Sequence, residues 1–336
     1  MGNVKSLARW GIGLGAQGVG LLAVAEGKQR SGLMVLCYHR ILPAAQRAGY
    51  YDTNLVVTPE AFASHCRLLA ARYTVCPFTE ALERWHRGER PAKPLAAITF
   101  DDGYRDNARH AAPVLAQHGL PATFFIIAGL VGSRSLPWYD AAGGAWNALA
   151  ARGEQPSNHA SAMAAVAWAK QISTAERTAW VEQLEQLASA PPPVEDDFIM
   201  NEDQLRALAA AGHEIGSHSL THPILTQCNE RDLLIETAES RERLGGVVGK
   251  APAAFCYPNG SHDARVRVAA ASAGYAWAAT MDPGVNQAQG VDPMAVRRWF
   301  VQEERLQGPN GGQCARLMRL EWSGLADSLY RRGAAQ

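Results

Sequence analysis

The chain has 336 residues, which is too long for one small hydrophobic core and fits either one large α/β barrel or two domains. Hydrophobic residues make up 47% of the chain and charged residues 19%, a balance that is typical of globular proteins and excludes extensive disorder. Lysine plus arginine and aspartate plus glutamate number 32 each, so the formal net charge is zero, which argues against a general nucleic-acid-binding protein.

Residues 1–32 are predicted to form a separate N-terminal segment. Lys5 and Arg9 precede the apolar, glycine-rich stretch GIGLGAQGVGLLAVA, which is shorter than the roughly 20 residues that a membrane span requires. One interpretation is a cleaved signal peptide, since the stretch ends in the small residues AVA, as signal-peptidase sites do. The repeated glycines and the glutamine make a poor signal core, so we favour a retained segment that contacts a membrane surface.

Six cysteines are scattered along the chain without a CxxC pair, which argues against a cysteine-based zinc site. Cys37 and Cys256 fall within predicted core strands, where an unpaired cysteine packs as a small hydrophobic side chain. This usage favours a reducing compartment. We therefore expect a cytoplasmic or membrane-associated protein rather than a periplasmic or secreted one.

Short apolar runs with β-branched and aromatic residues recur along the chain, and helical patterns lie between them. The predicted strands are residues 33–38, 95–100, 122–128, 213–218, 253–258, 275–280 and 296–301. The predicted helices include residues 59–72, 107–118, 201–211, 229–247 and 263–273. This alternation predicts a mainly parallel sheet in an α/β fold, and the number of strands favours a closed or nearly closed barrel.

Residues 134–200 interrupt the alternation because they contain no strand pattern. Their alanine-rich stretches and several tryptophans predict a helical insertion after the third strand. The barrel is otherwise expected to span residues 33–310, and residues 311–336 are expected to contain an amphipathic helix packed on its outside.

Polar residues follow the predicted strands at the points where these strands end. In a barrel of parallel strands the C-terminal ends meet on one face, so side chains far apart in sequence should share one pocket. The residues concerned are His39, the pair Asp101 and Asp102, His218 with His222, and the run Tyr257, Pro258 and Asn259.

The motif HSLTH, from His218 to His222, places two imidazoles where they can share a metal ion. The alternative is one capping and one loop histidine, but the pair lies on the same face as two adjacent carboxylates. One aspartate would complete a set of two histidines and one carboxylate, and the other would be free to take a proton from water. A simple turn, the alternative for the Asp-Asp-Gly sequence, does not require a second carboxylate.

The motifs TFDDGY, HSLTH and FCYPNG, in this order, resemble those of the NodB-type polysaccharide deacetylases, carbohydrate esterase family 4. The resemblance covers about residues 33–301 and implies a distorted barrel of seven to eight β/α units. It also implies a divalent metal, most often zinc, and hydrolysis of N-acetyl or O-acetyl groups on sugar polymers. By this resemblance Asp101 is the general base, and Asp102, His218 and His222 bind the metal. The sequence LCYHRIL further resembles the members that act on exopolysaccharides.

Two departures from the family pattern stand out. The third motif often carries an arginine that orients the base, but this chain has Cys256 there. The fifth motif often supplies a Leu-x-His general acid, but the corresponding AVRRWFV contains no histidine. We expect Arg298 to replace the missing arginine by binding Asp101, and His39 to protonate the leaving amine. The alternatives are an ion pair on the barrel rim for Arg298 and a packing role for His39.

Substrate contacts are expected from the third motif and from the start of the insertion. The candidates are Tyr257, Pro258, Asn259, Trp138 and Tyr139. Aromatic faces stack on sugar rings, although most tryptophans serve in packing. Together with these residues, the resemblance implies a metal-dependent enzyme that removes N-acetyl groups from amino sugars of a polysaccharide or its precursor. The alternatives are a non-catalytic glycan-binding protein on the same scaffold and an O-acetyl esterase that uses the same site.

Overall fold

The computed structural model describes residue 11 and residues 20–29, 32–154, 156–188, 193–287 and 291–325. Most of the predicted N-terminal segment therefore lies outside the described residues, as does the end of the predicted C-terminal helix. In the ranges given, no helix is both long and apolar enough to cross a membrane.

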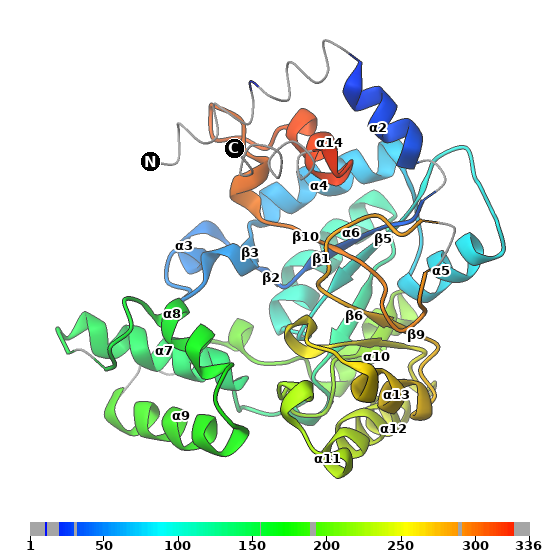
Figure 1. Ribbon diagram of the computed structural model, residues 1–336. Coiled ribbons are helices and arrows are strands. Elements are labelled where there is room, and N and C mark those ends of the chain that lie inside the picture. The colour runs from blue at the N-terminus through cyan, green and yellow to red at the C-terminus, as the bar shows by residue number, and fades with distance from the viewer. Residues whose placement is uncertain are drawn as a thin grey trace, which may run out of the picture.

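The centre of the molecule is a curled sheet of parallel strands (Figure 1). Its strands pair in the order β10-β1-β5-β6-β7-β8-β9, and β4 also pairs with β5. Their bounds are β1 (Met34–Tyr38), β4 (Thr74–Val75), β5 (Leu95–Phe100), β6 (Thr123–Ile126), β7 (Glu214–Ser217), β8 (Ala254–Cys256), β9 (Trp277–Ala279) and β10 (Trp299–Phe300). A second, two-stranded sheet pairs β2 (Arg40–Ile41) with β3 (Val56–Val57).

The segment that contains β10 brings the two ends of the curled sheet together. Val296 exchanges backbone hydrogen bonds with β9 and its flank, because its N–H donates to Ala278 and its carbonyl accepts from Thr280. A few residues later, β10 pairs with β1, with Trp299 opposite Leu36 and Phe300 opposite Cys37. The expected distorted, nearly closed barrel is thus confirmed. All seven predicted strands are present, β5 with the predicted bounds and the other six in a shortened form, whereas the two-residue strands β2, β3 and β4 were not predicted.

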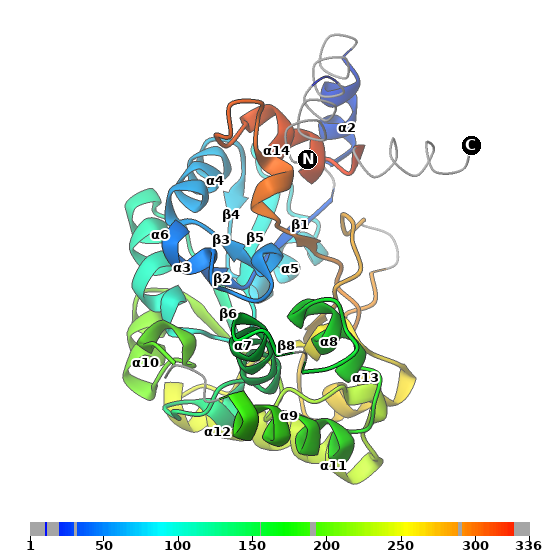
Figure 2. The ribbon, with the colours of Figure 1, turned by 90° about the vertical axis from the view of Figure 1, so that its left-hand side faces the viewer.

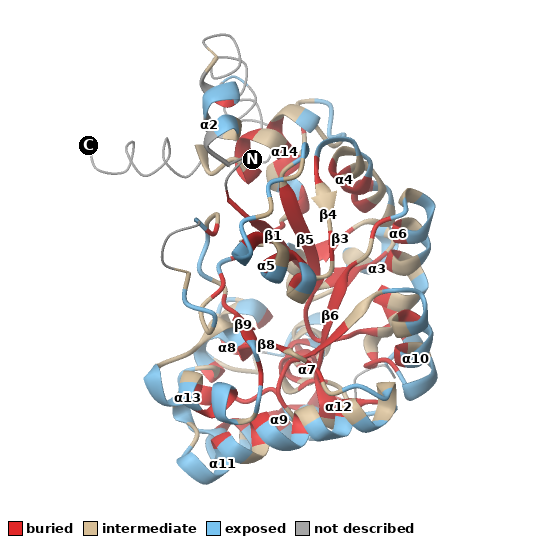
Figure 3. Ribbon diagram, turned by 90° about the vertical axis from the view of Figure 1, so that its right-hand side faces the viewer, coloured by how far each residue is buried: buried red, intermediate tan, exposed pale blue. Residues whose placement is uncertain are grey.

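Helices follow the strands and cover the outside of the sheet (Figures 2 and 3). The α-helices are α2 (Leu21–Gln29), α3 (Ala44–Arg47), α4 (Pro59–Arg72), α5 (Phe78–His86), α6 (Ala112–His118), α7 (Trp138–Ala151), α8 (Ala162–Ala169), α9 (Thr174–Ala188), α10 (Glu202–Ala210), α11 (Glu230–Leu234), α12 (Ser240–Val248), α13 (Ala264–Ser272) and α14 (Ala315–Trp322). Two π-helical turns, η2 (Asn107–Ala111) and η6 (Ile235–Glu239), precede α6 and α12. The 3-10 turns are η1 (Thr53–Leu55), η3 (Ala128–Leu130), η4 (Glu195–Asp197), η5 (Leu225–Gln227), η7 (Pro258–Gly260) and η8 (Glu303–Leu306).

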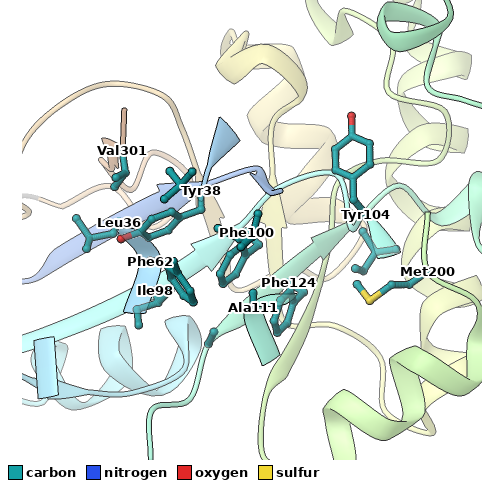
Figure 4. Packing of buried hydrophobic residues seen from close by; sticks show 14 of the residues in the cluster. Leu36, Tyr38, Phe62, Ile98, Phe100, Tyr104, Ala111, Phe124, Met200 and Val301 are labelled. Atoms are coloured by element: carbon teal, nitrogen blue, oxygen red, sulfur yellow. The ribbon is translucent and has the colours of Figure 1, made fainter. Parts of the chain in front are cut away.

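The main core lies between the sheet and its outer helices because the strands are buried on both faces. All six residues of β5 are buried, as expected for a central parallel strand with a continuous apolar sequence. Aromatic rings from successive strands stack here: Phe100 lies 4.9 Å from Phe124 and 5.4 Å from Tyr38, measured between ring centroids (Figure 4). This packing holds the ends of β1, β5 and β6 in fixed register.

Residues 134–200 form helices between β6 and β7, and no strand lies among the described residues of this range. Helix α7 packs against both α8 and α9. At the other end of the molecule α2 packs against α14, where Glu26 binds Arg319 at 2.6 and 2.7 Å. Part of the N-terminal segment thus contacts the C-terminal helix directly.

Candidate active site

The polar residues expected at the strand ends come together at the C-terminal ends of β1, β5, β7 and β8. Four residues other than glycine have positive φ in the described part of the chain, and all four lie in the loops of this site. They are Asp102, Ser219, His222 and Asn259, with φ between 57° and 70°. Such residues favour negative φ, so these loops hold a conformation that the surrounding structure must impose.

Asp102, His218 and His222 form a compact, buried group with the geometry of a metal site. The Nε2 atoms of both histidines lie 3.5 Å from the same oxygen, Oδ1 of Asp102. Ligands about 2.1 Å from a tetrahedral zinc ion lie roughly 3.4 Å apart, so these distances fit one ion between the three atoms.

Hydrogen bonding and charge state also suit the two imidazoles to bind a metal. Nδ1 of His218 donates to the carbonyl of Cys256 at 2.8 Å, which leaves the Nε2 lone pair directed at the shared position. Burial lowers the pKa of His218, and it lowers that of His222 strongly, with the charges of His218 and Lys170 adding to the effect at His222. Both rings are therefore neutral at neutral pH, which is the form that binds a metal.

The carboxylate of Asp102 also favours a cation. Burial raises the pKa of Asp102 well above its usual value, and the negative charge of Asp101 raises it further. A cation among the three side chains would offset both effects and keep Asp102 ionised. The residues present thus fit a divalent metal ion.

The loop between the two histidines is fixed by Glu236, a buried residue of the π-helical turn η6. Its carboxylate accepts hydrogen bonds from the backbone N–H groups of Leu220 and Thr221 at 2.8 and 2.9 Å, and from the Thr221 hydroxyl at 2.6 Å. Three charge-assisted hydrogen bonds hold this loop in its positive-φ conformation. Sequence reasoning missed Glu236, because a glutamate within a helical pattern gives no signal of such a contact.

Asp101 lies beside this group and is bound by Arg298. The guanidinium donates to both carboxylate oxygens at 2.7 Å, in a bidentate pair. Arg298 is itself held by the carbonyl of Thr280 at 2.8 Å and the hydroxyl of Thr99 at 3.1 Å. The expected contact between Arg298 and Asp101 is thus present, and Arg297 points to the exposed side, as strand alternation predicts. The catalytic roles of both residues stay predictions.

The charge of Arg298 decides the ionisation of Asp101. Burial alone would raise the pKa of this carboxyl, but the ion pair and hydrogen bonds with Arg298 hold it well below its usual range. The thiols of Cys37 and Cys256 also lie 3.5 Å from Oδ2 of Asp101. Two further groups of metal-ligating side chains can be drawn around Asp101, with Cys37 and His39 or with His218 and Cys256. The guanidinium disfavours a second cation in either place.

His39 faces the same carboxylate from the end of β1. Its Nε2 lies 4.0 Å from Oδ2 of Asp101, and its ring packs edge-on against Phe300. Burial lowers the pKa of His39 to about 4, so the ring is neutral at neutral pH in the free protein. Its role as a general acid stays a prediction and requires a proton gained during the reaction.

The first residues of α7 contact His222. Nε1 of Trp138 donates to the carbonyl of His222 at 3.2 Å, and the Tyr139 ring packs on His222. Tyr139 is buried and hydrogen-bonded to Asp102, so its side chain holds a proposed metal ligand and does not line an exposed substrate groove. A sugar contact stays a prediction for the partly exposed Trp138.

The residues of the YPNG sequence after β8 lie partly in the core and partly at the site. Tyr257 is fully buried and its hydroxyl donates to the carbonyl of Met294 at 2.9 Å, so its side chain belongs to the core, and a contact of this residue with substrate stays a prediction. Pro258 is also buried. Asn259 is exposed and accepts a hydrogen bond from Lys170 at 2.7 Å. Sequence reasoning missed Lys170, because a single lysine at the end of a helix carries no pattern.

Comparisons with known proteins agree with this arrangement. The family model for polysaccharide deacetylase matches residues 88–278, which is more than half of the chain. YxkH of Bacillus subtilis (strain 168), which is named for the same family, is 22% identical over 253 residues. The match covers 75% of this chain and 65% of YxkH, so it spans less than two thirds of that protein.

Two solved structures share the fold. IcaB from Ammonifex degensii has a TM-score of 0.57 at 20% identity, and the match covers 87% of this chain and 97% of that chain. The deacetylase PplD of Streptococcus pyogenes, in complex with acetate, has a TM-score of 0.57 at 19% identity, with coverage of 83% and 96%. The family match and the curled parallel barrel together show that the chain belongs to the polysaccharide deacetylase family, in its NodB-type form, carbohydrate esterase family 4.

Proposed function

We propose that the protein is a metal-dependent hydrolase that removes N-acetyl groups from amino sugars of a polysaccharide or its precursor. The observation that carries the proposal is the division of two adjacent carboxylates between two environments. Asp102 shares a position with two neutral histidines, whereas Asp101 is ionised and bound by Arg298. One carboxylate is thus suited to hold a cation and the other to accept a proton.

A divalent ion held by Asp102, His218 and His222 would supply a Lewis acid that activates water and polarises the acetyl carbonyl. Asp101 takes the proton from the attacking water, because its carboxylate lies beside this group and is ionised. Arg298 fixes the direction of that carboxylate through its two parallel hydrogen bonds. The proton then passes to the departing amine, for which His39 is the second available carrier at 4.0 Å from Asp101.

Release of acetate from N-acetylated oligosaccharides tests this function directly. We expect acetate from chitin oligomers with the metal-loaded protein, loss of release after chelation, and recovery when zinc is added back. Acetate from acetylated xylan but not from chitin oligomers would identify an O-acetyl esterase instead. Binding of the oligomers without any release of acetate would identify a glycan-binding protein on this scaffold.

Replacing Arg298 by methionine is expected to lower turnover by about 10- to 100-fold, the usual range for loss of a group that orients a functional side chain. Metal affinity should change little, because Arg298 contacts Asp101 and not the metal group. Turnover and metal content are measured together. The matched control is Arg297→Met, since the neighbouring side chain is exposed.

Removal of Arg298 also leaves the buried Asp101 without its cation, which is destabilising in itself. A second variant, Arg298→Lys, keeps the charge but loses the bidentate geometry. A folded Arg298→Met or Arg298→Lys protein with normal turnover would contradict the orienting role.

The location of the protein in the cytoplasm or at a membrane surface stays a proposal from the sequence. Its support is that all six cysteines are free thiols, most of them buried, as is usual in a reducing compartment. Cleavage or retention of the N-terminal segment in cells, read by mass spectrometry of the purified protein, tests it.

A further inference from the structure

Two cations lie close to the proposed active site without a carboxylate partner. Lys170 follows helix α8, and its ammonium group donates to Oδ1 of Asn259 at 2.7 Å. Arg177, in helix α9, is buried and donates to Oε1 of Gln227, to the Thr174 hydroxyl and to backbone carbonyls. Across the described ranges, no carboxylate oxygen comes within 4.0 Å of either side chain's nitrogens.

The two cations are held in one scaffold beside the metal group. Gln227 joins them, because its Nε2 donates to the carbonyl of Lys170 at 2.9 Å while its Oε1 accepts from Arg177. The Arg177 guanidinium stacks on the Trp138 ring at 4.9 Å, and that indole in turn donates to the carbonyl of His222. A continuous set of contacts therefore connects these cations to a proposed metal ligand.

Lys170 contacts a loop of the site directly. Its partner Asn259 is one of the four residues other than glycine with positive φ that lie in these loops. The acidic groups in the field of Lys170 are Asp52 and Asp102, and neither is in contact with it. Its hydrogen-bond partner Asn259 is exposed and lies in the loop after β8, three residues beyond Cys256, so the pair lies at the C-terminal end of that strand.

Cations elsewhere in the interior have anionic partners. Arg298 binds Asp101, and Arg40 binds Asp106 at 2.5 Å. A partly buried ammonium group that has only a neutral amide as its partner loses hydration without the compensation that an anion gives. An oxyanion brought by the ligand would supply that partner, through a charge-assisted hydrogen bond.

We propose that Lys170 binds an oxyanion of the glycan substrate, so that the preferred substrate is an acetylated amino sugar with a carboxylate or a phosphate close to its acetamido group. Arg177 holds the side chain of Gln227, which donates to the carbonyl of Lys170, and Asn259 sets the direction of the ammonium group. This inference rests on the proposed function for the position of the acetamido group, and it adds the charge of the substrate.

Equilibrium binding tests the inference without requiring turnover. Calorimetry with the metal-loaded protein compares a chitin tetrasaccharide, which is neutral, with a hyaluronan tetrasaccharide, whose uronates carry carboxylates. N-acetylglucosamine and N-acetylglucosamine 1-phosphate form the second pair, which separates phosphate from carboxylate. We expect the anionic member of at least one pair to bind about 10- to 100-fold more tightly, the range for a hydrogen bond to a charged group.

Lys170→Met should abolish this preference by weakening the binding of the anionic sugars, whereas Lys170→Arg should retain it. Lys93→Met is the matched control, because Lys93 is exposed and donates only to the carbonyl of Ala70. Equal binding of neutral and anionic sugars by the wild-type protein would overturn the inference, as would a preference that survives in Lys170→Met. Acetate release by the same preparations reports separately on the proposed function, so failure of one is distinguishable from failure of the other.

Discussion

Replacing Asp101 by asparagine is expected to lower turnover by about 10²- to 10⁴-fold, the contribution of a general base, while the metal content stays the same. The amide cannot accept the proton from water, but it has nearly the same shape as the carboxylate. Asp101 is not one of the three side chains that converge on the metal position. Turnover is measured by acetate release, and metal content by elemental analysis of the same preparation.

The neighbouring variant Asp102→Asn is the control for this assignment. It should weaken metal binding itself, because Oδ1 of Asp102 is the atom that both histidines approach at 3.5 Å. An Asp101→Asn protein with more than about a tenth of wild-type turnover would be too active for a lost base. Equal loss of metal from both variants would contradict the assignment of Asp101 as the base and Asp102 as the metal ligand.

Replacing either His218 or His222 by alanine is expected to remove metal and activity together. Each ring offers its Nε2 to the shared position, and a site with two remaining ligands binds a divalent ion weakly. We expect the affinity for zinc to fall by more than about 100-fold, because even loss of an outer-shell partner commonly costs 10- to 100-fold. Competition with a chromogenic chelator gives this affinity without reference to turnover.

The control for the histidine variants is His86→Ala, since His86 is exposed at the end of α5, far along the chain from both motifs. This variant should keep its metal. A His222→Ala protein that binds one zinc ion with wild-type affinity would remove His222 from the metal group.

The sequence predicted the parallel strands and the gathering of their C-terminal ends because most of the strands are short, largely apolar runs between helical patterns. The contact between Arg298 and Asp101 was predicted because the family resemblance left Asp101 without its usual arginine and Arg298 lies near the end of the last strand, while alternation set Arg297 apart. The contacts of Glu236, Lys170 and Tyr257 were not predictable in this way. Each depends on how two loops or helices pack against one another, and neither periodicity nor composition records that packing.

The very short strands and helix α5 (Phe78–His86) were missed for a different reason. A two-residue strand such as β4 has too few residues to show a period, and it exists only because β5 offers it backbone partners. In contrast, Thr58 and Pro59 marked the start of α4 correctly, because capping chemistry is local to the residues that carry it.

The two π-helical turns make the site depend on the number of residues in the chain as well as on their identity. Glu236 in η6 pins the loop between the histidines, and Asn107 in η2 donates to the carbonyl of His39 at 2.8 Å. A π-turn contains one residue more than the α-helical turn it interrupts, and an α-helix rotates by about 100° per residue. Deleting one residue from either turn would therefore rotate these side chains away from the loops they hold. A relative whose sequence lacks one residue in η2 or η6 is thus expected to have a different arrangement of the site loops. This holds even if it retains the residues equivalent to Asp101, Asp102, His218 and His222.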